Sequence, residues 1–306
     1  MSEKSTEREA KNAVFSHENA PSEPSPNPSQ QQPKKSNLPP PPRAANPLAD
    51  LGIEIPVETI PLPSAGKTYP QNSALYNKRT ISIKSMTAKE EDILTSRALI
   101  KNGTVITKLL QSCIVDKTVD VPSMLMGDIN AVMVAIRCTG YTTKYETSVT
   151  CVHCSNIQKE EFDLGQLPIK QLTIEPDEPG TNVFSVTLPK TKARVQFKFL
   201  TGRDTEELQV LDGRKKKLGY KVDNLITARL QHSLLSVNGK TDKTLLSKFI
   251  QHMPALDSLT LRTYVDDNEP GIDMSAVVEC SNVDCGAVEE VSIPLGVSFF
   301  WPGAGK

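Results

Sequence analysis

Two pairs of cysteines are the residues of this chain best suited to chemistry. The first pair is Cys151-Val-His-Cys154 and the second is Cys280-Ser-Asn-Val-Asp-Cys285. Two cysteines a few residues apart at a hairpin tip aim both thiolates at one point, and two such pairs form the closed tetrahedron of structural zinc. The sequence therefore predicts a structural Zn²⁺ site made of Cys151, Cys154, Cys280 and Cys285. Because protein sulfur fills every position of such a site, the ion would hold structure and would not activate water.

This metal prediction has alternatives. The two pairs are separated by 125 residues, far more than in a compact zinc finger, and the second pair is the more widely spaced, so the cysteines could also hold no metal. His153 could replace a thiolate, although a solvent-facing residue of the turn is the simpler interpretation. Cys113 and Cys138 fall on apolar faces of predicted helices, where small core residues are expected. Since residues 1–11 lack the apolar stretch of a secretory signal, the cysteines are expected as thiols or metal ligands in a reducing compartment.

An internal repeat gives the two pairs a reason to meet. Residues 81–94 align with residues 195–208, and the offset grows from 114 residues at the start to 129 residues at Cys151 and Cys280. A slow drift of this kind is typical of a diverged duplication with small insertions. The equivalent positions include Thr87 and Thr201, Asp128 and Asp257, Arg137 and Arg262, and Cys151 and Cys280. A pseudo-twofold relation between the copies would bring the two hairpin tips face to face.

The hydrophobic pattern predicts the same order of elements in both copies, namely strand, helices and a cysteine-tipped hairpin. In the first copy we expect a strand at 80–84, a helix capped by Thr87 with Glu90 at the capping-box position, a helix at 105–114, a helix from Pro122 to about 139, and a hairpin of 145–152 with 157–164. In the second copy we expect strands at 182–188 and 193–200, helices at 201–211, 223–235, 242–252 and 254–265, and a hairpin of 272–279 with 287–293.

The predicted fold class is α+β, with two related helix-plus-β-hairpin lobes and a zinc-ribbon-like site between them. The first lobe spans residues 51–170 and the second spans residues 171–306. Residues 1–50 contain 10 of the 23 prolines and few large apolar residues, so they are predicted to form a disordered arm. A solvated arm is the simpler interpretation of this stretch, and a docking tract for a partner is the alternative.

Composition argues against several classes of protein. The net charge is −1 and aromatic residues make up 5% of the chain, which disfavours a dedicated nucleic-acid binder. No stretch approaches the length of a membrane span. The basic run 214–217 is expected in a solvated loop. The segment Ser64-Ala-Gly-Lys-Thr68 ends like a phosphate-binding loop, but Pro61 stands where its first glycine should be, so a simple turn is expected. No catalytic constellation is recognisable, and the chain is not expected to be an enzyme.

Several motifs of the chain resemble those of the T-even-type (T4-like) phage baseplate family, the hub subunits and hub-assembly proteins of contractile tails. The resemblance begins with Leu62-Pro-Ser-Ala-Gly-Lys-Thr-Tyr-Pro70 and Met86-Thr-Ala-Lys-Glu-Glu-Asp-Ile-Leu94. It continues through residues 103–111 and 127–137, and then through Asp257, Ser258, Arg262, Pro270, Gly271, Cys280, Cys285, Gly286 and 299–302. Together these motifs cover most of residues 53–302, whereas residues 1–50 lie outside the resemblance.

The resemblance implies a structural or assembly component of the central baseplate hub that acts by binding other tail proteins. Such a protein would be located in the virion tail baseplate, which assembles in the host cytoplasm. It could be a permanent subunit or a transient assembly factor, and it could form an oligomer within a symmetric baseplate. The expected contact segments are the arm, residues 53–69 and the aromatic stretch 299–301, which could instead close the core. Two rival functions remain: a zinc-ribbon regulator that binds nucleic acid, and a hydrolase carried by the baseplate.

Overall fold

The described chain mixes helices with short antiparallel strand pairs. The structure is a computed structural model that describes residues 51–217 and 225–301, which belong to the compact unit Ala44–Lys306. The predicted arm, residues 1–50, lies outside the described residues. The expected mixture of helices and small hairpins is confirmed.

Among the described residues, the strands form four two-stranded sheets and one three-stranded sheet, and every pairing is antiparallel. Three sheets are local pairs: β1 (Val57–Pro61) with β2 (Thr80–Lys84), β3 (Lys144–Thr150) with β4 (Ile157–Asp163), and β10 (Ser275–Glu279) with β11 (Val288–Ser292). The three-stranded sheet has the order β6 (Phe184–Thr187), β7 (Arg194–Phe197), β8 (Leu234–Val237). The pair β5 (Ile169–Lys170) and β9 (Gly271–Ile272) joins segments about one hundred residues apart.

Eight α-helices lie within the same described ranges. In chain order they are α1 (Ala88–Thr95), α2 (Arg97–Asn102), α3 (Val105–Cys113), α4 (Met126–Gly140), α5 (Gly202–Lys217), α6 (Leu225–Ser233), α7 (Lys243–His252) and α8 (Ala255–Asn268). Most of these bounds agree with the helices expected from the hydrophobic period, because each helix of the core carries apolar residues at helical spacing.

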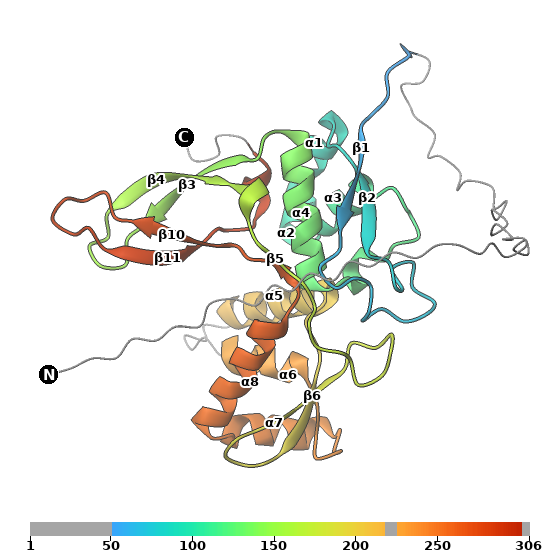
Figure 1. The fold of residues 1–306 in the computed structure, drawn as a ribbon, viewed down its shortest axis with the longest axis vertical. Helices are drawn as coiled ribbons and strands as arrows, with labels where there is room; N and C mark the ends of the chain where they lie inside the picture. Colours follow the sequence, from blue (N-terminus) through green and yellow to red (C-terminus); the bar gives the residue numbers. More distant parts are fainter. Residues whose placement is uncertain (1–50, 218–224, 302–306) are drawn as a thin grey trace, which may run out of the picture. The chain divides into compact units, whose positions relative to one another are not determined.

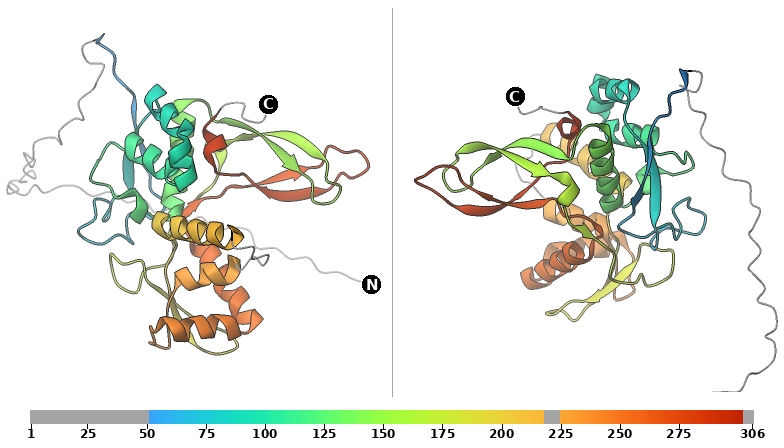
Figure 2. Two further views of the ribbon diagram at one scale, coloured as in Figure 1. Left: turned by 180° about the vertical axis from the view of Figure 1, so that it is seen from behind. Right: turned by 45° about the horizontal axis from the view of Figure 1, so that its top comes forward.

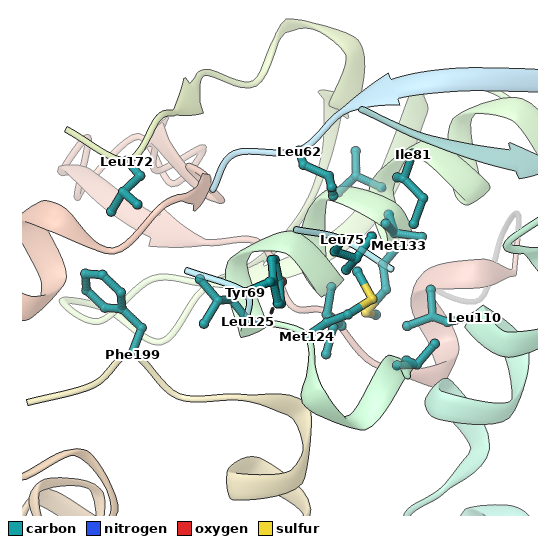
Figure 3. Close-up of a cluster of buried hydrophobic side chains, with 14 of the residues drawn as sticks. Leu62, Tyr69, Leu75, Ile81, Leu110, Met124, Leu125, Met133, Leu172 and Phe199 are labelled. Carbon is teal, nitrogen blue, oxygen red and sulfur yellow. Dashed lines mark hydrogen bonds between the residues drawn. The ribbon is translucent and has the colours of Figure 1, made fainter. Parts of the chain in front are cut away.

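Helix α4 lies within the core, where it contacts β1, β2, α3, α5 and β9 (Figures 1 and 2). Nine of its fifteen residues are buried, and Val132 and Ile136 are fully so. Figure 3 shows Leu62, Leu75 and Ile81, from the first strand pair and its loop, gathered beside Met133 of α4. A helix that is buried on most sides carries apolar residues around most of its circumference instead of along one face, and the sequence of α4 has this pattern.

Arg137 of α4 is a buried cation that ties later segments to the helix. Its side chain is 2% exposed, and it donates to the carbonyls of Phe299 (3.1 Å), Thr142 (2.7 Å) and Lys144 (3.2 Å). Phe299 and Phe300 are fully buried. The two phenylalanines therefore close the core, and the expectation that they form a partner contact is wrong for these two residues.

Two hairpin loops are fastened to the core by a buried aspartate in the same way. Asp128, at the third position of α4, accepts hydrogen bonds from Ser64 N (3.0 Å), Ser64 Oγ (2.6 Å) and the Tyr69 hydroxyl (2.6 Å). Asp257, at the third position of α8, accepts from Lys190 N (2.7 Å) and Thr191 N (2.9 Å). Both carboxylates have no exposed side-chain surface. Each aspartate therefore fixes the loop of one strand pair to the start of one helix.

Two helix starts also share one arrangement of a lysine, a threonine and an acid. In the first turn of α1, Glu90 accepts a hydrogen bond from Thr87 N (3.0 Å) and pairs with Lys84 (3.1 Å). In the first turn of α5, Asp204 makes the equivalent contacts, with Thr201 N at 3.0 Å and Lys198 at 2.7 Å. In both cases the lysine stands three residues before the threonine. The predicted capping box at Thr87 is confirmed.

The segment 64–68 is a turn, as predicted, and it cannot cradle a phosphate. Ala65 and Gly66 adopt positive φ angles of 50° and 71°, and the Ser64 N–H that a phosphate would need already donates to Asp128. A Cβ at Gly66 would lie 2.4 Å from the Leu75 carbonyl oxygen, so only glycine fits there.

Three boundary predictions are wrong. Pro122 does not begin α4, because it lies in a separate 3₁₀ turn (Val121–Ser123) and the helix starts at Met126. The helix predicted at 223–235 ends at Ser233, because β8 begins at Leu234 and pairs with β7, and residues 223 and 224 lie outside the described residues. The basic run 214–217 is not in a loop, because α5 extends to Lys217. At Leu234 the pairing with β7 outweighs the local helical signal.

Candidate metal centre

The four cysteines predicted to bind metal meet at the tips of two hairpins. The β3–β4 and β10–β11 pairs lie side by side in all views (Figures 1 and 2), and the four sulfur atoms lie within 4.8 Å of one another. Two of the sulfur–sulfur distances join the two hairpins: Cys151 Sγ lies 3.9 Å from Cys285 Sγ, and Cys154 Sγ lies 3.6 Å from Cys280 Sγ. A tetrahedron with metal–sulfur bonds of about 2.3 Å requires sulfur–sulfur distances of about 3.8 Å. The donor set therefore fits one shared ion.

Local backbone structure places each sulfur at its hairpin tip. Cys151 N donates to the Asn156 carbonyl at 2.9 Å, and Cys280 N donates to the Ala287 carbonyl at 2.8 Å, so each pair of strands closes just beyond its first cysteine. The residue after the second cysteine is left-handed in both tips, with φ of 59° at Ser155 and 52° at Gly286. This turn directs the following backbone N–H groups back toward sulfur. We call the segments 151–158 and 279–288 the two knuckles.

The thiols of the cluster differ in how readily they ionise. The backbone N–H of Asn156 donates to Cys154 and lowers the pKa of that thiol to about 7. The N–H of Ala287 likewise favours the Cys285 thiolate, but desolvation and the neighbouring cysteines outweigh it and raise the pKa of Cys285 to about 12. A bound dication removes the repulsion between the sulfurs, because its charge favours every thiolate at once.

The contact between the knuckles is polar. Gln158 donates to the Glu279 carbonyl (2.8 Å) and accepts from Ser281 N (2.7 Å). Asn156 Nδ2 donates to Ser281 Oγ (3.1 Å). Hydrogen bonds near a protein surface stabilise by about 1 kcal/mol or less each, since water competes for the same groups. An ion that joins the four sulfurs would be the strongest link at this end of the hairpins.

The other candidate residues are not in the cluster. Within the described ranges, the group of possible ligands consists of the four cysteines alone, and His153 is exposed beside it. Cys113 is fully buried in the core, where burial raises the pKa of its thiol to about 12. Cys138 is half-buried and also lies apart from the cluster. The expectation that Cys113 packs as a small core residue is confirmed.

Sequence reasoning missed the residues that join the knuckles. Gln158, Asn156 and Ser281 lie in polar stretches whose composition gives no sign of a contact across 121 to 125 residues. Gly286 did carry a signal, because glycine directly after a second cysteine supplies the left-handed residue that a knuckle needs.

The family of the chain follows from a match over most of its length. The family model described as T4 bacteriophage base plate protein matches residues 57–301, which include both strand-pair loops, α4, α8 and both knuckles. The chain belongs to the T4 bacteriophage base plate protein family. No curated protein and no solved structure matches it.

As a member of this family, the protein is a structural component of a phage tail baseplate, and its partners are other phage tail proteins. It confirms the resemblance that the motifs at 62–70 and 86–94 indicated. None of the described helices of the baseplate protein is long and apolar enough to cross a membrane.

Proposed function

We propose that this protein is a component of the central hub of the tail baseplate, as a subunit or an assembly factor, and that it acts by binding other tail proteins in the host cytoplasm. The family match over residues 57–301 carries this proposal. The test is a phage in which the gene is interrupted. Lysates should lack complete baseplates by electron microscopy, and the protein supplied in trans should restore them. Normal baseplates without the protein would refute the proposal.

We further propose that the four cysteines bind one structural Zn²⁺. The sulfur distances of 3.6 to 3.9 Å between the hairpins and the polar contact between the knuckles support this assignment. Four cysteine ligands leave no open coordination position, so the ion would hold the hairpins together and supply no reactive water. Zinc is the usual ion for a site of four cysteines, because thiolates are soft ligands that accept tetrahedral geometry.

Elemental analysis tests the zinc proposal. The purified protein should contain about one zinc per chain, and Cys151→Ser should release it. Cys138→Ser is the matched control, because Cys138 lies outside the cluster and this variant should keep its metal. Protein without zinc, or a Cys151→Ser variant that keeps its zinc, would refute the assignment.

The two halves of the chain are proposed to derive from a duplication, with the cysteine site between them. The aspartates at the third positions of α4 and α8 and the lysine–acid pairs before α1 and α5 support it, since each recurs at equivalent positions. Family sequences provide the test. A profile built from the first half of other members should detect the second half, and a failure to do so would contradict the duplication.

The protein is proposed to have no catalytic activity of its own. One hollow of about 540 Å³ is lined mainly by hydroxyl and amide side chains, and Asp120 is the only carboxylate among its lining residues. Asp120 already faces Arg203 at 3.4 Å. Tyr69, the other titratable side chain of the lining, donates to Asp128, and burial together with that carboxylate raises its pKa well above the usual range. The lining therefore offers no pair of groups suited to acid–base work near neutral pH. Clearing of peptidoglycan by the purified protein would instead support the hydrolase alternative.

The nucleic-acid alternative meets an unfavourable charge at the cysteine site. The two hairpins, residues 144–163 and 275–292, contain two lysines and eight acidic residues. Phosphate contacts require the opposite sign. A shift of DNA mobility that weakens with added salt would nevertheless revive that alternative.

A further inference from the structure

Four strongly exposed aliphatic side chains lie close in sequence to the four cysteines. Val152 is 79% exposed, Ile157 69%, Val283 95% and Val288 63%. In each knuckle one aliphatic residue stands two positions before the second cysteine and another stands three positions after it. We call these four residues the knuckle surface. The same pattern in both knuckles places exposed apolar groups around the cysteine cluster on each of the two hairpins.

The strand partners of the knuckle surface are polar, and the apolar Val277 on the same face of β10–β11 as Val288 is itself 73% exposed, so it leaves that face uncovered. Ile157 is paired across β3–β4 with Thr150, and Val288 is paired across β10–β11 with Glu279. Side chains alternate between the faces of a strand, so both aliphatic groups stand on the faces opposite the knuckle contact. Complete burial of each such side chain would contribute about 1.5 to 3 kcal/mol. Burial of this surface by a partner would therefore contribute substantially to the free energy of binding.

The charge around the knuckle surface restricts what could cover it. The two hairpins hold eight acidic residues against two lysines, and one of the lysines, Lys144, is paired with Glu161 at 2.7 Å. Glu279 and Glu290 lie on the same β10–β11 pair as Val288 and are exposed. Two copies of this chain that met through these faces would oppose like charges, which is unfavourable. A cover with basic residues around an apolar centre would match both the charge and the valines.

We propose that the knuckle surface binds another tail protein through a patch of aliphatic residues surrounded by lysine or arginine. This inference rests on the proposed function, which supplies the tail protein, and it adds the site and the chemistry of the partner. The cysteine site would support the contact indirectly. One ion shared by both knuckles fixes Val152 and Ile157 relative to Val283 and Val288, so the partner meets a preorganised surface.

Carbodiimide crosslinking in infected cells tests the proposal, because the reagent joins carboxylates to lysines in direct contact. In wild-type particles or assembly intermediates, Glu279, Asp284 or Glu290 should crosslink to lysines of one other tail protein, identified by mass spectrometry. The double variant Val283→Ser/Val288→Ser should lower that yield by about tenfold, as expected for removal of central apolar contacts. The matched control is Leu256→Ser/Leu259→Ser on α8, where the leucines are 47% and 53% exposed; this control should leave the yield unchanged.

Two results would overturn the proposal. One is crosslinks from these carboxylates only to other copies of this chain, or to no tail protein. The other is an unchanged yield in Val283→Ser/Val288→Ser. The zinc content of each variant separates loss of the surface from loss of the metal. If interruption of the gene leaves baseplates complete, the proposed function fails; if interruption blocks assembly while the valine variant assembles and crosslinks normally, only the knuckle surface fails.

Discussion

Replacing Asp128 by alanine should destabilise the protein far more than the same change at Asp257, although both carboxylates are fully buried. The Asp128→Ala change removes the acceptor of three donors: Ser64 N, Ser64 Oγ and the Tyr69 hydroxyl. All three of these hydrogen bonds are buried. A buried donor left without an acceptor costs about 1 to 3 kcal/mol.

The expected magnitude follows from how far each donor can adjust. The two hydroxyl groups can rotate toward other partners, but the Ser64 N–H is fixed by the backbone, so Asp128→Ala should cost about 3 to 5 kcal/mol. The Asp257→Ala change leaves two donors without their acceptor, the N–H groups of Lys190 and Thr191. These hydrogen bonds are only part-buried, so water can replace the lost carboxylate. That variant should cost about 1 to 2 kcal/mol.

Urea unfolding followed by circular dichroism measures both changes. The midpoint of unfolding should fall much further for Asp128→Ala than for Asp257→Ala at an unchanged slope, and both variants should keep the zinc content of the wild-type protein. The reasoning is refuted if Asp128→Ala costs less than about 1 kcal/mol, or if Asp257→Ala is the more damaging change.

Three further predictions concern the core and the hairpins. Burial opposes the charge of Glu90, but hydrogen bonds from Ser112 and Thr87 lower its pKa from 4.5 to about 2. Because the pKa is lowered in the folded state, Glu90 contributes to the free energy of unfolding above about pH 4.5, and this contribution is lost as the pH falls toward 2. An acid titration of the stability of Glu90→Gln should lack this loss. The Gly127→Ala change should destabilise by about 3 kcal/mol or more in urea unfolding, because its Cβ would lie within 1.6 Å of the Pro270 carbonyl oxygen; normal stability would show that this contact can open. Chelation of zinc should open the knuckles while the core stays folded, so hydrogen exchange should rise at residues 151–156 and 280–287 and stay slow in α4; equal protection with and without chelator would contradict the role of the ion.

Much of the cysteine site could be predicted because its signals are local. The spacing of each pair, the alternating strands around it and the repeat at Thr87 and Thr201 are all visible in a single sequence. Together they predicted that the four sulfurs would meet, and the structure brings them within 4.8 Å. The family resemblance rested on motifs that the fold now explains in part, since Ser64, Gly66 and Tyr69 of the first motif shape or fasten one turn.

The features that the sequence could not predict depend on contacts between distant residues. Leu234 continues an apolar helical pattern but becomes a strand, because β7 offers it a partner. Pro122 has the chemistry of a first helical residue, yet its 3₁₀ turn ends before α4 begins. Arg137 looked like one of a pair with Arg262, but only Arg137 is buried among carbonyl groups from other segments. In each case the deciding neighbour is specified elsewhere in the chain.

The hydrogen bond from Arg137 to the Phe299 carbonyl also determines when, during synthesis, this part of the core can close. The two residues are 162 positions apart, so α4 emerges from the ribosome long before the carbonyl that receives its guanidinium exists. Until residue 299 arrives, a cation and the apolar groups beside it remain without their final cover. A nascent chain stalled before that point should therefore bind chaperones and be cleaved readily by protease, and both behaviours should end once residue 299 has left the ribosome.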